Sequence, residues 1–103
     1  MGTLLYTISE NERKTVDTRD GVVTYRELGS GTPLVLLHGI GSGSESWCSQ
    51  LLGLADFYHV IAWDAPGYGG SAPVTPSAPS AADYAGRLET FLDALGLTAC
   101  HLV

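Results

Sequence analysis

Basic residues are scarce in this chain of 103 residues, which has five Lys and Arg against eleven Asp and Glu. The formal net charge at neutral pH is therefore −6. Arg13, Lys14, Arg19 and Arg26 are interleaved with acidic residues, so the sequence predicts no basic patch. Nucleic acids and anionic membranes are recognised by positively charged surfaces. The composition thus predicts neither a nucleic-acid nor a membrane partner.

Long apolar runs and cysteines are also scarce. No stretch reaches the roughly 18 consecutive apolar residues of a membrane span, and the first residues lack the pattern of a secretory signal. Cys48 and Cys100 are too few for a disulfide framework or a zinc site. We expect both to be reduced thiols of a cytoplasmic protein. The length allows at most one small domain, and the apolar fraction of 45% predicts a folded core.

Strand and helix signals alternate along the chain. Asp20-Gly21 is a strong hairpin signal, and the unbroken apolar run at 34–37 is typical of a strand covered on both faces. Ser80-x-x-Asp83 is a variant of the helix capping box. Strands are expected at 13–18, 22–28, 34–37, 58–62 and 99–103, with helices from about Ser44 or Ser46 and from Ser80 to Gly96. This order predicts an α/β fold with a mostly parallel sheet, an antiparallel first strand and helices on both faces.

The segment 37–43, Leu-His-Gly-Ile-Gly-Ser-Gly, follows the expected strand at 34–37 and is the first candidate for chemistry. Its glycines let the backbone turn sharply with N–H groups directed at a ligand, as stabilisation of an oxyanion requires. A turn that merely connects two elements is the alternative. His38 stands at the strand end, where we expect it to bond the local backbone rather than act as a general base. Gly39, Ser42 and Trp47 are expected to contact substrate.

The second candidate segment is 64–71, Asp-Ala-Pro-Gly-Tyr-Gly-Gly-Ser, which also follows an expected strand. Asp64 is expected to accept backbone N–H groups and, with Gly67 and Gly69, to shape the turn. No second carboxylate or His lies near it in sequence, so no metal site is predicted. Both segments partly fit a dinucleotide-binding loop, but Ser44 stands at the third glycine position of the better match. Nucleotide binding remains an alternative.

These segments carry a family resemblance. Leu36-Leu37-His38-Gly39-Ile40, then Ser46-Trp47, then the run 60–71 together resemble the α/β-hydrolase superfamily, in particular its small esterases, enol-lactonases and carbon–carbon bond hydrolases. The resemblance covers nearly all of the chain from Thr15 onward. It implies that residues 1–103 are the N-terminal part of a single α/β-hydrolase domain, with strands one to five and the first two helices.

The resemblance also implies the roles of the site residues. The backbone N–H of Ile40 would stabilise the oxyanion, and Gly41 would shape that pocket. The family's Gly-x-Ser-x-Gly motif is missing, because Ser71 lacks one of its glycines and Ser42 lacks both. The nucleophile, the acid and the catalytic His would therefore lie beyond Val103. No cofactor is implied.

The function implied is hydrolysis of an ester, a lactone or an activated C–C bond of a small molecule. It would require a complementary C-terminal chain that carries the nucleophile, the acid and the His, as in a split or nicked enzyme. A non-catalytic ligand-binding protein of the same fold is the alternative. We further expect the last strand, at 99–103, to be internal in the complete sheet, so that another segment covers its free edge.

Overall fold

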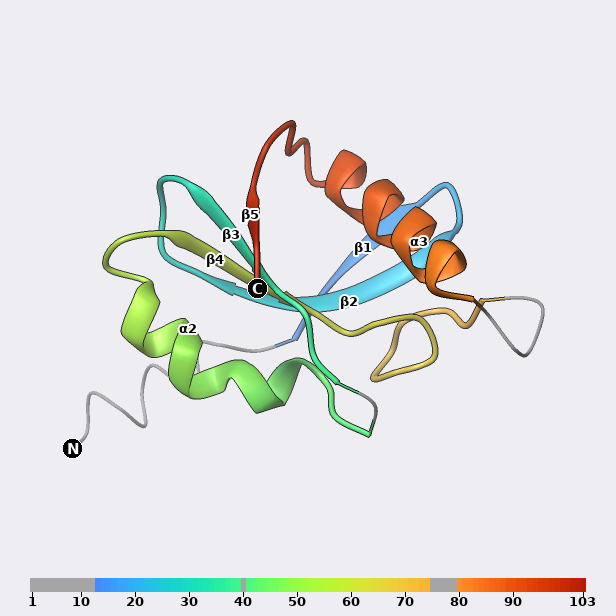
Figure 1. The fold of residues 1–103 in the computed structure, drawn as a ribbon, viewed down its shortest axis with the longest axis horizontal. Coiled ribbons are helices and arrows are strands. Elements are labelled where there is room, and N and C mark those ends of the chain that lie inside the picture. Colours follow the sequence, from blue (N-terminus) through green and yellow to red (C-terminus); the bar gives the residue numbers. More distant parts are fainter. Residues whose placement is uncertain (1–12, 40, 75–79) are drawn as a thin grey trace.

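A five-stranded sheet forms the centre of the part of the chain that the computed structural model describes, residues 13–39, 41–74 and 80–103 (Figure 1). The strands are β1 (Lys14–Thr18), β2 (Gly21–Leu28), β3 (Pro33–Leu36), β4 (His59–Trp63) and β5 (His101–Leu102). Their order across the sheet is β1-β2-β4-β3-β5. β2 is antiparallel to β1 and β4, whereas β3 is parallel to β4 and β5. The predicted α/β fold, with a mostly parallel sheet and an antiparallel start, is confirmed.

Helices cover the two faces of this sheet. The 3₁₀ turn η1 (Ser44–Trp47) leads into α2 (Cys48–Leu54), and α3 (Ala81–Ala94) lies on the opposite side (Figure 1). None of the helices in the described ranges combines the length and hydropathy needed to cross a bilayer. The arrangement of helices on both faces agrees with the sequence-based prediction.

Side chains along β3 alternate between the two faces, which explains its unbroken apolar sequence. Val35 packs in the cluster beneath α3, whereas Leu34 and Leu36 pack in the cluster beneath α2 with Leu51. A strand buried on both faces needs apolar residues at every position. The prediction for 34–37 is therefore confirmed, although the strand ends one residue earlier, at Leu36.

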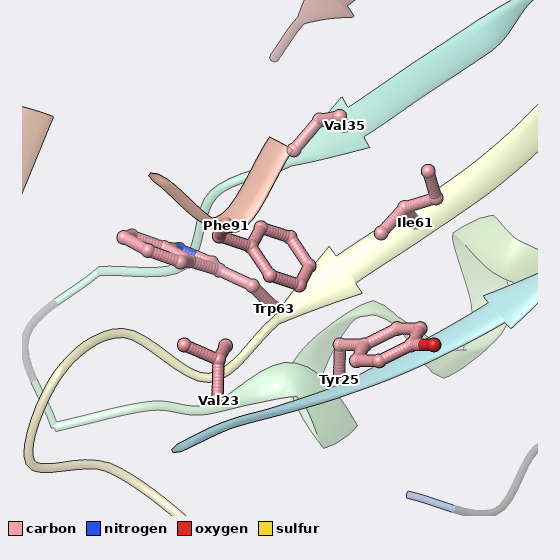
Figure 2. Packing of buried hydrophobic residues seen from close by; sticks show 6 residues of the cluster. All are labelled: Val23, Tyr25, Val35, Ile61, Trp63 and Phe91. Carbon is pink, nitrogen blue, oxygen red and sulfur yellow. The ribbon is translucent and has the colours of Figure 1, made fainter. Parts of the chain in front are cut away.

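Phe91 is the centre of the cluster beneath α3 (Figure 2). Its ring lies 5.4 Å from that of Tyr25 in an edge-on arrangement and 5.8 Å from that of Trp63. Phe91 is fully buried, and aromatic pairs of this geometry add to the stabilisation that burial itself gives. Since Tyr25 and Trp63 face each other across β2 and β4, this contact anchors α3 over the middle of the sheet.

The capping box predicted at Ser80 is present at the start of α3. The Ser80 hydroxyl accepts the backbone N–H of Asp83, and the Asp83 carboxylate accepts the backbone N–H of Ser80. At the other end, Gly96 has φ +75°, the left-handed conformation that commonly ends a helix at glycine. Both helix boundaries follow from these short sequence signals.

Ser80→Ala is expected to lower the free energy of unfolding by about 1 kcal/mol, because the substitution removes the side-chain oxygen that accepts the N–H of Asp83. Urea denaturation followed by circular dichroism measures the change. Ser49→Ala, at an exposed position within α2, is the control and should cause no loss. Equal stability of the Ser80→Ala variant and the wild type would contradict this account of the helix start.

Candidate active site

The loop after β3, the turn after β4 and the end of β5 meet at one edge of the sheet. The carboxyl ends of parallel strands lie at the same edge, which is where open α/β sheets bind ligands. Val103 pairs closely with β3, since its N–H donates to Val35 O at 2.9 Å and its C=O accepts from Leu37 N at 3.0 Å. The end of β5 therefore lies beside His38 and the loop that follows β3.

Asp64 is fully buried directly after β4 and binds groups from three other parts of the chain. Its Oδ1 accepts the backbone N–H of Ser44 at 2.7 Å. Its Oδ2 accepts the Thr24 hydroxyl at 2.6 Å and forms an ion pair with Arg13 Nε at 2.9 Å. One carboxylate thus connects β2, the start of η1 and the segment before β1.

The turn after β4 is shaped around this carboxylate. The Ser71 hydroxyl donates to the backbone C=O of Asp64 at 2.6 Å and accepts the backbone N–H of Thr24 at 2.9 Å. Gly69 has φ +52°, and a Cβ there would lie 2.5 Å from Asp64 Oδ2. Only glycine fits at that position without displacing the carboxylate. Gly67, with φ +86°, is exposed and has open space around it.

The pKa of Asp64 lies below its usual value. Burial by itself raises this pKa, but the hydrogen bonds from Thr24 and Ser44 and the charge of Arg13 outweigh burial. Hydrogen bonds to the ionised form favour that form. A carboxylate stabilised in this way is a weak base, and its oxygen atoms are already engaged by the protein.

His38 connects the loop after β3 with the turn after β4. Its Nε2 accepts the backbone N–H of Ala65 at 2.9 Å, and its Nδ1 lies 2.9 Å from the carbonyl oxygen of Gly39. A ring nitrogen that accepts carries no proton, so these partners assign the proton to Nδ1. In this arrangement neither nitrogen is free to take a proton from a substrate.

Tyr68 is a residue that the sequence reasoning missed. Its hydroxyl accepts the backbone N–H of Gly41 at 3.3 Å, and its ring packs edge-on against His38 with ring centres 4.8 Å apart. Tyr68, His38 and Gly39 border a cavity of about 440 Å³. The residues lining the cavity are Leu37, His38, Gly39, Trp63, Ala65, Tyr68 and Tyr84. The sequence signal for this residue is a tyrosine between Gly67 and Gly69, which by itself indicates only part of a turn.

The residues predicted to contact substrate do not all lie at this edge. Gly39 lines the cavity, and Ser42 donates its N–H to the carbonyl oxygen of Gly39 at 3.2 Å. Trp47 packs beneath α2, on the other face of the sheet, and its buried Nε1 has no hydrogen-bond partner among the described residues. Ile40 lies outside the described residues. The roles assigned to these four residues, and to Gly41, stay predictions.

Within 13–39, 41–74 and 80–103, no three His, Cys, Asp or Glu side chains are grouped so that they could hold a metal ion.

Comparison with known proteins identifies the family. The model of the alpha/beta hydrolase fold matches residues 32–103, which include β3, β4, β5 and the two segments at their carboxyl ends. The chain belongs to the α/β-hydrolase family. The match covers both candidate segments and confirms the resemblance seen in the sequence.

Among similar α/β-hydrolases, (E)-2-((N-methylformamido)methylene)succinate hydrolase of Acinetobacter baylyi is 44% identical over 67% of this chain and 23% of that protein. 2-Hydroxy-6-oxo-6-phenylhexa-2,4-dienoate hydrolase of Comamonas testosteroni is 32% identical over 84% of this chain and 32% of that protein. The crystal structure of an epoxide hydrolase from Vigna radiata superposes with a TM-score of 0.83 at 28% identity, over 92% of this chain and 32% of that one. This chain thus spans between 23% and 32% of the length of these relatives.

Asp64→Asn is expected to lower the free energy of unfolding by about 2 kcal/mol, because the amide loses the ion pair with Arg13 and weakens a charge-assisted hydrogen bond. Chemical denaturation measures the loss, and Asp56→Asn, at an exposed position, is the matched control. A variant that unfolds at the wild-type denaturant concentration would contradict the structural role of Asp64.

The same substitution changes the dependence of stability on pH. The pKa of Asp64 in the folded protein lies below its value in the unfolded chain, which is about 3.9. The charged form of Asp64 therefore contributes its full stability above about pH 3.9. The contribution is lost as pH falls through the folded-state pKa. Asp64→Asn should therefore lose less stability than the wild type as the pH falls below about 4, which chemical denaturation at a series of pH values measures.

Proposed function

We propose that this chain is the part of an α/β-hydrolase that supplies backbone N–H groups to the oxyanion during cleavage of a small-molecule ester, lactone or activated C–C bond. The nucleophile would be a serine, and a His and an acid would transfer the protons. All three groups belong to a C-terminal part of the enzyme outside this chain.

The observation that carries the proposal is the anchoring of the loop between β3 and η1 beside the end of β5. His38 bonds the turn after β4 at the start of the loop, and the N–H of Ser44 donates to buried Asp64 at its end. Donors held before the reaction need no rearrangement when negative charge develops on the substrate. A nucleophile following β5 would emerge beside the start of this loop, since Val103 pairs with Leu37.

The relatives support a hydrolase. Two of those described above carry the name of a hydrolase acting on substituted succinate and dienoate compounds, and the solved neighbour is an epoxide hydrolase. The chain includes the loop between β3 and η1, but it spans only a minor share of the length of each relative. The choice among ester, lactone and C–C bond is therefore part of the proposal.

Ile40→Pro tests the oxyanion role in the complete enzyme, because proline removes the backbone N–H at that position. Loss of one oxyanion donor costs about 3 kcal/mol in the transition state, so kcat for p-nitrophenyl acetate should fall about a hundredfold. Ile40→Val keeps the N–H and should retain activity. Circular dichroism establishes that both variants fold.

Unchanged turnover by a folded Ile40→Pro enzyme would remove Ile40 from the mechanism. A wild-type protein that binds small esters without turnover would instead favour the non-catalytic ligand-binding function.

We also propose that a second, C-terminal chain completes the domain at the free edge of β5. Leu102 and Val103 are 54% and 61% exposed, and β5 pairs with β3 alone among the described strands. An apolar strand edge of this kind favours pairing with another strand. A denaturing gel of protein purified from its natural source should show a second band beside the 10.8 kDa chain. A single band at that mass, or one larger band, would end the idea of a split enzyme.

A further inference from the structure

The hydrogen bond between Gly41 and Tyr68 leaves the hydroxyl proton of Tyr68 available to a ligand. A phenol hydroxyl has one proton to donate and lone pairs to accept. In this structure its oxygen accepts the N–H of Gly41 at 3.3 Å, so the proton is not used in that contact. No other hydrogen bond of this hydroxyl involves the described residues.

The position of Tyr68 is fixed by its surroundings. Its N–H donates to the carbonyl oxygen of Ala65 at 2.8 Å, and its own carbonyl oxygen accepts the N–H of Ser71 at 2.9 Å. The imidazole against its ring, that of His38, is itself bonded at both nitrogens. A donor held in place in this way loses little conformational entropy when a ligand binds.

The cavity beside Tyr68 selects for uncharged groups. Among the described residues, its lining contains the aromatic rings of Trp63, Tyr68 and Tyr84 and the apolar side chain of Leu37, and no Asp, Glu, Lys or Arg. Asp64, the nearest carboxylate in sequence, is fully buried and satisfied within the protein. A charged group entering this space would lose its hydration without gaining a counter-charge.

We propose that Tyr68 is a substrate-binding residue whose hydroxyl donates to an oxygen of an uncharged, apolar substrate group seated in this cavity. The inference rests on the proposed function, because it names the class of group that the hydrolase takes beside the loop after β3. The N–H of Gly41 polarises the hydroxyl and strengthens its donation, since chained hydrogen bonds reinforce one another.

Two probes of similar shape separate the hydrogen bond from apolar packing. Acetophenone carries a carbonyl acceptor on an aromatic ring, and ethylbenzene lacks the oxygen. In titrations of the intact protein followed by NMR, Tyr68→Phe should weaken acetophenone binding about fivefold, the usual size of one neutral hydrogen bond, and leave ethylbenzene binding unchanged. Tyr58→Phe, on the side of the sheet covered by α2, should change neither dissociation constant.

Equal losses for both probes, no loss for either, or no binding of acetophenone to the wild type would each overturn the assignment. Turnover measurements keep this test apart from that of the proposed function. Ester hydrolysis that persists while the probe difference is absent removes only the role of Tyr68. A probe difference without any hydrolysis leaves the binding role intact and removes the hydrolase.

Discussion

The buried charge of Asp64 is the constraint on which the geometry of this site depends. An ionised carboxylate without water is very unfavourable unless hydrogen bonds and a counter-charge replace its hydration. Here the replacements come from Thr24 on β2, the N–H of Ser44 and Arg13. Because each lies on a different segment, the carboxylate is satisfied only when all three segments are in place. Local errors in the loop after β3 therefore carry a large energetic cost.

This constraint acts on the part of the chain to which we assign oxyanion stabilisation. The loop between β3 and η1 is rich in glycine, so its backbone alone would sample many conformations. His38 limits that freedom at one end and Ser44 at the other, and both bond to the segment that follows β4. The parallel pairing of β3 with β4 and β5 brings these groups to one edge. Hydrogen bonds to the segment after β4 thus fix both ends of the loop, in addition to the bond that Ser42 makes to Gly39 within it.

Elements set by local chemistry were predictable from the sequence. The capping box at Ser80, the hairpin at Gly21 and the two-sided burial of β3 each depend on neighbouring residues, and each is present. The predicted strand at 99–103 is shorter in the structure, at His101–Leu102, and pairs with two residues of β3. Asp64 was expected to accept backbone N–H groups of the turn that follows it. Among the described residues its carboxylate accepts instead from the N–H of Ser44 and the hydroxyl of Thr24 and pairs with Arg13.

The partners of Asp64 were not predictable in the same way. Thr24 and Arg13 lie far from it in sequence, and a polar residue in a strand gives no sign of what it will meet across the sheet. Trp47 shows a related difficulty, since helical spacing places it with Leu51 and Leu54 but does not say which face of the sheet they cover. The structure puts them together beneath α2, away from the cavity.

The satisfied carboxylate and the uncharged cavity are two parts of one arrangement. Hydrogen bonds lower the pKa of Asp64 and engage its oxygen atoms, so its charge is directed into the protein rather than toward the ligand. The neighbouring space, lined by Trp63, Tyr68 and Tyr84, then has a low local polarity. In such surroundings a backbone N–H or a phenol proton attracts developing negative charge more strongly than it would in water. Under the proposed function, keeping the nearest carboxylate out of the cavity would let weak neutral donors stabilise an oxyanion there.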